Sequence, residues 1–241
     1  MTGIRPTIDL QPETYGHWRT SDVGAITERL ERGVILDMLG DVSGRRVLDV
    51  GCGDGDLAVD LSRRGALVDG IDTAPSMIEA ARQRASEQRS TARFQVASAQ
   101  NLPFAAEQFD LVVAVTILCF VQDAPPVLAE IARVLRPGGR LVIGELGTWS
   151  SWAAMRRVRG WLGSPLWRKA KFRTARELRA LAGGAGLVAG PVRGAIYYPH
   201  CGLGARLIGP FDSRVSRMTN FGAAFLAMAA AKPIPLVTAQ G

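Results

Sequence analysis

The sequence lacks several features that would assign it to particular classes of protein. Its 3 cysteines, Cys52, Cys119 and Cys201, are scattered, which excludes a disulfide framework and a Cys-x-x-Cys motif. The longest apolar run, residues 221–231, is too short to span a bilayer. The first residues have no apolar segment of the signal-peptide type. These absences predict a reduced, cytoplasmic protein, with attachment to a membrane surface as the alternative location.

Histidine and lysine are also scarce, and this narrows the chemistry available. The 2 histidines are His17 and His200, and no group of residues has metal-ligand spacing, so we predict no metal site. The 29 lysines and arginines, nearly all arginines, exceed the 22 acids and give a net charge of +7. Many of them lie among tryptophans in residues 149–173. That basic run is short and no RNA-binding module accompanies it, which argues against nucleic acid as a partner.

What the sequence does contain is a regular alternation of apolar runs and amphipathic segments. Such an alternation predicts βαβ units and a parallel sheet covered on both faces. A helix over 22–39 precedes it, and a helix with a Thr174–Glu177 capping box follows it. Two further strands end the chain, with a loop or short helix between them. The predicted strands cover residues 46–50, 66–72, 92–97, 109–115, 139–146, 187–199 and 221–233; the predicted helices between the first five cover 55–65, 74–88 and 124–139.

The first apolar strand runs into three glycines at alternate positions, in the stretch RRVLDVGCGDGDLAVDLSRRG. A glycine turn between a strand and a helix presents backbone N–H groups and the positive end of the helix to a ligand. Asp72, at the end of the second strand, stands where an acid can accept both hydroxyls of a ribose. Because Asp49, Asp54 and Asp56 would repel a pyrophosphate, we expect a nucleoside ligand that carries positive charge.

Four stretches together resemble the class I S-adenosylmethionine-dependent methyltransferases, and most closely the small-molecule branch that includes ubiquinone and menaquinone C-methyltransferases. The resemblance covers about residues 45–146 and rests on VLDVGCGDGDLA, VDGIDTAPSMIEAAR, ASAQNLPFAAEQFDLVVAVTILCFV and EIARVLRPGGRLVIGEL. It implies a Rossmann-like three-layer α/β/α sandwich whose seven-stranded sheet is mostly parallel, with an antiparallel last strand. The chain would then comprise an N-terminal helical cap (1–44), a cofactor-binding core (45–146), and an acceptor-site cap with the C-terminal strands of the same domain (147–241).

The resemblance also implies S-adenosylmethionine as cofactor, S-adenosylhomocysteine as product, and roles for individual residues. Asp49 would help to fix the ammonium of the cofactor, and Asp72 would hold the ribose hydroxyls. Ser98 stands where the family commonly has an acid near the adenine amino group, so this contact should be weaker here. The full implied cofactor set is Asp49, Gly51, Gly53, Gly55, Asp72, Thr73, Met77, Ser98, Ala99, Val115 and Thr116.

The acceptor site must come from the variable segments, and we expect a small, apolar or aromatic acceptor of the quinone-precursor or natural-product kind. Methyl transfer needs mainly alignment, but an oxygen or acidic carbon acceptor would call for a base, for which His200 and Glu145 are candidates. The segment 149–173 could be a solvated lid or a face for peripheral membrane contact. The expected acceptor-binding residues are Tyr15, Trp18, Trp149, Trp152, Tyr197, Tyr198 and His200.

Two other functions fit the same layered architecture. One is an NAD-dependent oxidoreductase, against which the early third glycine and the acidic turn argue. The other is a cofactor-binding module without catalysis, against which the intact glycine turn and Asp72 argue.

Overall fold

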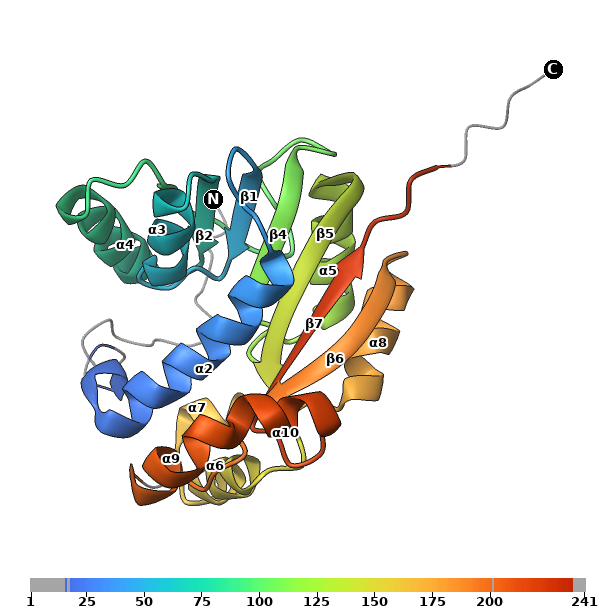
Figure 1. The fold of residues 1–241 in the computed structure, drawn as a ribbon. Helices are drawn as coiled ribbons and strands as arrows, with labels where there is room; N and C mark the ends of the chain where they lie inside the picture. Colours follow the sequence, from blue (N-terminus) through green and yellow to red (C-terminus); the bar gives the residue numbers. More distant parts are fainter. Residues whose placement is uncertain (1–15, 17, 201, 236–241) are drawn as a thin grey trace.

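The computed structural model describes residues 16, 18–200 and 202–235, and its centre is one twisted seven-stranded sheet (Figure 1). The strand order is β3-β2-β1-β4-β5-β7-β6, and β7 is antiparallel to both of its neighbours while the other pairs are parallel. This confirms the predicted fold class. The strands are β1 (Arg46–Val50), β2 (Leu67–Asp72), β3 (Arg93–Val96), β4 (Phe109–Val115), β5 (Leu135–Leu146), β6 (Val188–Ala195) and β7 (Phe225–Ala231).

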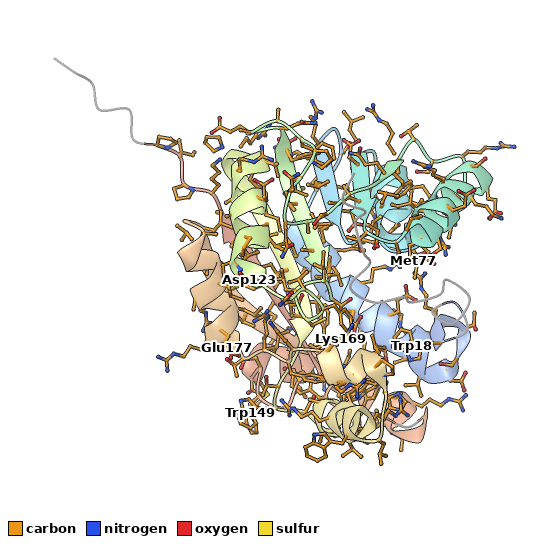
Figure 2. All side chains as sticks on the ribbon, turned by 180° about the vertical axis from the view of Figure 1, so that it is seen from behind. Trp18, Met77, Asp123, Trp149, Lys169 and Glu177 are labelled. Carbon is orange, nitrogen blue, oxygen red and sulfur yellow. The ribbon has the colours of Figure 1, made fainter. Side chains whose placement is uncertain are left out.

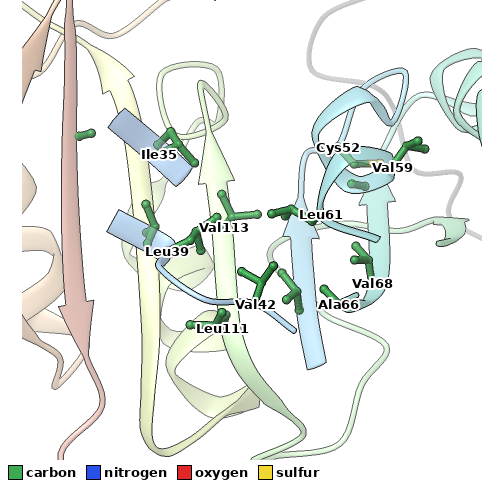
Figure 3. Close-up of a cluster of buried hydrophobic side chains, with 14 of the residues drawn as sticks. Ile35, Leu39, Val42, Cys52, Val59, Leu61, Ala66, Val68, Leu111 and Val113 are labelled. Carbon is green, nitrogen blue, oxygen red and sulfur yellow. The ribbon is translucent and has the colours of Figure 1, made fainter. Parts of the chain in front are cut away.

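Helices cover both faces of the sheet, as the near-continuous apolar strands require. On one face lie α2 (Asp22–Leu39), α3 (Asp56–Arg63) and α4 (Pro75–Glu87); on the other lie α5 (Ala124–Val134) and α8 (Ala175–Gly184). Two separate clusters of buried side chains fill the two interfaces. Figure 3 shows the first of them, where Ile35 and Leu39 of α2 pack with Val113 of β4 and Leu61 of α3.

Local signals explain where several helices begin and end. The Ser21 side chain accepts from the N–H of Gly24 at the start of α2, and the Thr174–Glu177 capping box begins α8 as expected. The helix expected over residues 124–139 instead ends at Val134, and β5 begins at Leu135. Pro137 disfavours a helical conformation at the residue before it, which helps to explain the extended backbone there.

The remaining helices gather at one end of the sheet, where β1, β2, β4 and β5 end; we call this end the carboxyl edge. There lie α6 (Ser151–Trp161), α7 (Pro165–Lys169), α9 (Gly202–Ile208), the short 3-10 helix η1 (Gly209–Phe211) and α10 (Asp212–Met218). The N-terminal half of α2 packs against α9, so it also reaches this edge. Ligands of open α/β sheets bind beyond the carboxyl ends of the strands, and the candidate site is therefore sought here.

Candidate functional site

The glycine turn between β1 and α3 is open at its middle glycine. Gly51, Gly53 and Gly55 all have positive φ, which favours glycine. A methyl group on Gly51 would collide with the side chain of Ile117 at 2.9 Å, and one on Gly55 would collide with Ala81 at 2.8 Å. Apart from the two neighbours of Gly53 in the chain, no atom of the described residues lies within 4 Å of a methyl group added to Gly53. The backbone at Gly53 is therefore accessible to a ligand.

Asp72 closes β2 beside this turn and is held by backbone groups. Its Oδ2 accepts from the N–H of Gly53 at 3.0 Å, and its Oδ1 accepts from the N–H of Ala74 at 2.9 Å. An ionised carboxylate has about four lone-pair sites, so two bonds leave acceptor capacity free. The carboxylate thus shapes the turn and can still accept hydroxyl groups of a ligand.

Asp49 lies within β1 directly before the turn and has an unsatisfied oxygen. Its side chain is 3 % exposed, and its Oδ2 has no hydrogen-bond partner in the described part of the chain. Burial, with the negative charge of Asp72 adding to it, raises the pKa of Asp49 to about 7. A positively charged group of a ligand would satisfy this carboxylate, so the site fits an ammonium-bearing nucleoside such as S-adenosylmethionine.

Asp54 and Asp56 differ from Asp49 because arginines neutralise them. Asp54 is 6 % exposed, and its Oδ2 forms ion pairs with Arg19 Nη1 at 2.7 Å and with Arg84 Nη2 at 2.5 Å. Asp56 pairs with Arg19 at 2.6 Å and also with Arg32. The expectation that all three acids present negative charge to the ligand is corrected: only Asp49 lacks an arginine partner among the described residues. The ion pairs instead join the glycine turn to residue 19 and to α2 and α4.

The residues expected around the adenine lie after β2 and β3, which are neighbours in the sheet. Thr73 follows β2, and Met77 is buried in the first turns of α4. Ser98 and Ala99 follow β3, and Ala99 is buried. The hydroxyl of Ser98 accepts from the N–H of Gln100 at 3.3 Å. Their roles as adenine contacts stay a prediction.

The end of β4 lies beside the glycine turn. Val115 is the last residue of β4, and Thr116 follows it with a φ of 51°, which is unusual for a residue other than glycine. The N–H of Thr116 donates to the carbonyl of Gly144 at 2.7 Å. The side chain of Ile117 fills the space beside Gly51, so this segment closes one side of the turn. Strained backbone of this kind often accompanies a functional site.

The two candidate bases have different surroundings. Glu145 is completely buried, and its Oε1 accepts from the N–H of Leu118 at 2.7 Å, which fixes the segment after β4. Burial raises the pKa of Glu145 to about 7. His200 is partly exposed, its ring lies 4.3 Å from that of Trp152, and burial lowers its pKa. Glu145 is therefore well placed to position the backbone, while His200 borders an aromatic group.

Three of the expected acceptor residues join segments that are far apart in the sequence. Trp152 of α6 is 1 % exposed, and its Nε1 donates to the carbonyl of Tyr198 at 2.8 Å. The hydroxyl of Tyr198, also buried, lies 2.9 Å from the hydroxyl of Thr27 in α2. With the ring of His200, these contacts hold α6, α2 and the segment after β6 together.

The other expected acceptor residues lie elsewhere. Trp149 is 62 % exposed and borders a separate cavity of about 190 Å³ with Phe221, away from Trp18 (Figure 2). Trp18 is partly buried. The Tyr197 hydroxyl donates to the carbonyl of Thr219. Tyr15 lies outside the described residues.

Two charged residues near these aromatic side chains were not anticipated. Arg156 of α6 lies between two tryptophan rings, 5.0 Å from the centroid of Trp152 and 4.8 Å from that of Trp167. Glu31 of α2 is partly exposed, and burial raises its pKa to about 7. A signal for Glu31 does exist in the sequence. It stands four residues from Thr27 and four from Ile35, so an acid interrupts the stripe of α2 that these two buried residues define.

Comparisons with known proteins find methyltransferases. The family described as Methyltransferase domain matches residues 48–143. The ubiquinone biosynthesis O-methyltransferase of Methylobacterium sp. is 33 % identical over 168 residues, which cover 67 % of each chain. Methyltransferase GfsG of Streptomyces halstedii is 38 % identical over 138 residues, which cover 55 % of this chain and 50 % of that protein. The chain spans about half the length of most of the curated relatives it matches.

Solved structures show the same fold. A Thermotoga maritima structure, described as a SAM-dependent methyltransferase and possible histamine N-methyltransferase, aligns with a TM-score of 0.70 at 22 % identity. The alignment covers 91 % of this chain and 95 % of that one. At this identity the likeness shows the fold alone.

Proposed function

The chain belongs to the class I S-adenosylmethionine-dependent methyltransferases, and we propose that its acceptor is a small, largely apolar or aromatic molecule bound at the carboxyl edge of the sheet. When bound, S-adenosylmethionine supplies a methyl group on a positively charged sulfur, which a nucleophilic acceptor atom can take by in-line displacement. The chain's own part is to bind and align the two ligands and to exclude water. The comparisons favour neither an NAD-dependent oxidoreductase nor a module without catalysis.

The cofactor would be held by a few side chains and by open backbone. Asp49 would accept the ammonium, because its buried Oδ2 has no partner among the described residues. Asp72 would accept the ribose hydroxyls with the lone pairs that Gly53 and Ala74 leave free. The open space over Gly53 would admit the methionine part. These assignments rest on the geometry of the turn and are tested below.

The observation that carries the acceptor proposal is the aromatic group at the carboxyl edge. The guanidinium of Arg156 lies within 5.0 Å of the ring centroids of Trp152 and Trp167. The ring of His200 lies 4.3 Å from that of Trp152. Flat aromatic side chains bury a large apolar area and suit an aromatic or apolar ligand. The Methylobacterium relative is named for an O-methylation in ubiquinone biosynthesis, which supports an acceptor of quinone-precursor character.

Peripheral contact with a membrane stays a prediction. None of the helices in the described ranges is long and apolar enough to cross a membrane. The outer side of α6 exposes Val158 at 46 %, Trp161 at 83 % and the following Leu162 at 81 %. Apolar and aromatic residues beside arginines are the composition of a face that lies on a membrane surface.

Calorimetric titration and a labelled-methyl screen test the proposed function. We expect S-adenosylmethionine and S-adenosylhomocysteine to bind, and NAD not to bind. The protein is then incubated with cofactor labelled in the methyl group and with a panel of phenols, quinols and aliphatic amines. Label in the aromatic acceptors supports the proposal, whereas label only in the aliphatic amines contradicts it.

A further inference from the structure

Glu31 and Arg156 are opposite charges that the described part of the protein leaves without hydrogen bonds. No hydrogen bond or ion pair within 4.0 Å joins either side chain to another described residue, although both are only partly exposed. Each is the strongest opposite charge acting on the other. Most charged groups near the glycine turn are paired, as Asp54 and Asp56 are. A carboxylate and a guanidinium that make no hydrogen bond to the described residues have acceptors and donors available for a ligand.

Printed contacts locate Glu31 at the carboxyl edge. Thr27, one helical turn before it, bonds to Tyr198 at 2.9 Å. Ile35, one turn after it, lies so close to Gly144 of β5 that a methyl group there would approach its Cδ1 to 3.1 Å. Residues four apart share one side of a helix, so Glu31 faces the same region between Tyr198 and the end of β5.

Arg156 approaches the same region from α6. Its guanidinium lies 5.0 Å from the ring centroid of Trp152, and the Nε1 of Trp152 donates to the carbonyl of Tyr198 at 2.8 Å. The rings of Trp152 and Trp167 hold the guanidinium by cation–π contact, and its N–H groups donate no hydrogen bond to another described residue. Both residues therefore lie around Tyr198, at the carboxyl edge of the sheet.

We propose that Glu31 and Arg156 together bind the acidic hydroxyl of a phenol or enol acceptor, with Glu31 taking its proton and Arg156 stabilising the oxygen anion. The inference rests on the proposed function and narrows the acceptor to one chemical class. An acceptor carboxylate would be repelled by Glu31, and an acceptor ammonium would be repelled by Arg156. A hydroxyl is neutral when it meets the ionised carboxylate and becomes anionic beside the guanidinium, so it suits both.

The proton transfer balances without any further reactant. The acceptor O–H bond breaks, its proton forms an O–H bond with Glu31, and the electron pair stays on the acceptor oxygen. That pair then forms the bond to the methyl carbon, while the electrons of the carbon–sulfur bond remain on sulfur. Glu31 afterwards releases the proton to water. General-base assistance of this kind contributes about 10²–10⁴-fold to a rate.

The surroundings of Glu31 suit this role near neutral pH. The groups that act on it are Arg156 of α6 and Glu28 of its own helix, and Tyr198 also lies near it. Burial raises its pKa to about 7, so the carboxylate is ionised and able to accept a proton above that pH. Glu28 is engaged with Arg19 and Arg32, and burial raises the pKa of Tyr198 to about 12, so neither of them competes for the proton in this range.

Proton uptake on binding of a phenolate tests the proposal without an activity assay. The protein saturated with S-adenosylhomocysteine is titrated with 4-nitrophenol and with 4-nitrocatechol at pH 8, in two buffers of different ionisation enthalpy. If Glu31 and the phenol oxygen share a proton, binding of the anion takes up about one proton per site. Glu31→Gln should bind with no uptake, and Glu79→Gln, which alters an exposed acid of α4, should retain it.

A second pair of variants tests Arg156. Arg156→Lys keeps the charge but loses the planar guanidinium, so we expect affinity for the phenolate to fall on the order of 10- to 100-fold. Arg159→Lys, which changes an exposed residue of the same helix, should bind like the wild type.

Proton uptake that persists in Glu31→Gln would overturn the role of Glu31, and wild-type affinity in Arg156→Lys would overturn that of Arg156. A wild-type protein that binds S-adenosylhomocysteine but neither phenol overturns the acceptor class alone, while failure to bind S-adenosylhomocysteine overturns the proposed function.

Discussion

The two halves of the carboxyl edge are built in different ways. The proposed cofactor half, at β1 and β2, consists mainly of backbone: the glycine turn, the two N–H groups that donate to Asp72, and the carboxylate of Asp49, whose Oδ2 has no partner among the described residues. The proposed acceptor half, between α2 and α6, consists of large side chains, among them Trp152, Trp167 and Tyr198. Backbone geometry suits a ligand that every member of a family shares, whereas side chains can be exchanged without moving a strand. Substitutions in the acceptor half should thus alter acceptor choice while sparing the cofactor.

The largest effect is expected where the acceptor half depends on one buried ring. Trp152→Ala should lower the free energy of unfolding by about 3–5 kcal/mol, because it leaves a cavity and removes the bond to the Tyr198 carbonyl. Trp161→Ala is the matched control on the same helix. Its ring is 83 % exposed, and its effect should stay within about 0.5 kcal/mol. Urea titration of both variants measures the difference, and equal stabilities would show that the buried ring of Trp152 does not hold the acceptor half together.

A smaller effect is expected at Asp72 in the cofactor half. Asp72→Asn should weaken binding of S-adenosylhomocysteine by about 1.5–3 kcal/mol, since the ribose hydroxyls would lose charge-assisted bonds. Asp69→Asn changes an acid of the same strand that faces Arg93, and it should bind normally. Calorimetry gives the affinities, and thermal melts check that both variants fold. Unchanged affinity in a folded Asp72→Asn protein would remove this residue from the site.

The pH dependence of cofactor binding sharpens the role of Asp49. Burial raises the pKa of Asp49 from 3.8 to about 7, so the free energy of unfolding of the ligand-free protein falls as pH rises from about 4 to about 7. A bound ammonium favours the ionised form, and affinity should therefore fall as pH drops below 7, approaching tenfold per unit. Asp49→Asn should bind more weakly at pH 8 and without this slope, while the free variant unfolds no more easily than the wild type. The same slope in both proteins would assign the titration to another group.

The smallest effect concerns the outer side of α6. Arg159→Glu should reduce binding to anionic lipid vesicles at low salt by about 1 kcal/mol per basic charge removed. Arg63→Glu, an exposed change in α3, serves as the control for net charge. Vesicle sedimentation measures both. If neither variant differs from the wild type, the exposed face of α6 has no part in membrane contact.

Much of the fold could be predicted because its signals are local. The strands of residues 45–146 are continuous apolar runs, and the capping box of α8 lies within four residues. The predicted helix over 124–139 extends too far, because the apolar pattern of the helix continues through Leu135 while the backbone there is already extended.

The site could be predicted only in part because its charges meet across long separations. Asp54 is neutralised by Arg19 across 35 positions, and no local pattern indicates that partner. Glu31 and Arg156 come from different helices for the same reason. Trp149 and Trp152 looked equivalent in the sequence, yet α6 begins between them, so one is exposed and the other buried.

Helix α2 contributes to both proposed binding sites, and this has a kinetic consequence. Glu28 and Arg32 of α2 belong to the ion pairs of the glycine turn, while Thr27 and Glu31, one position earlier in each case, face the acceptor half. A cofactor that orders the glycine turn therefore also orders the side of α2 against which the acceptor would bind. We therefore expect an ordered sequential reaction in which the cofactor enters first and leaves last. In that scheme S-adenosylhomocysteine inhibits competitively against S-adenosylmethionine and noncompetitively against the acceptor.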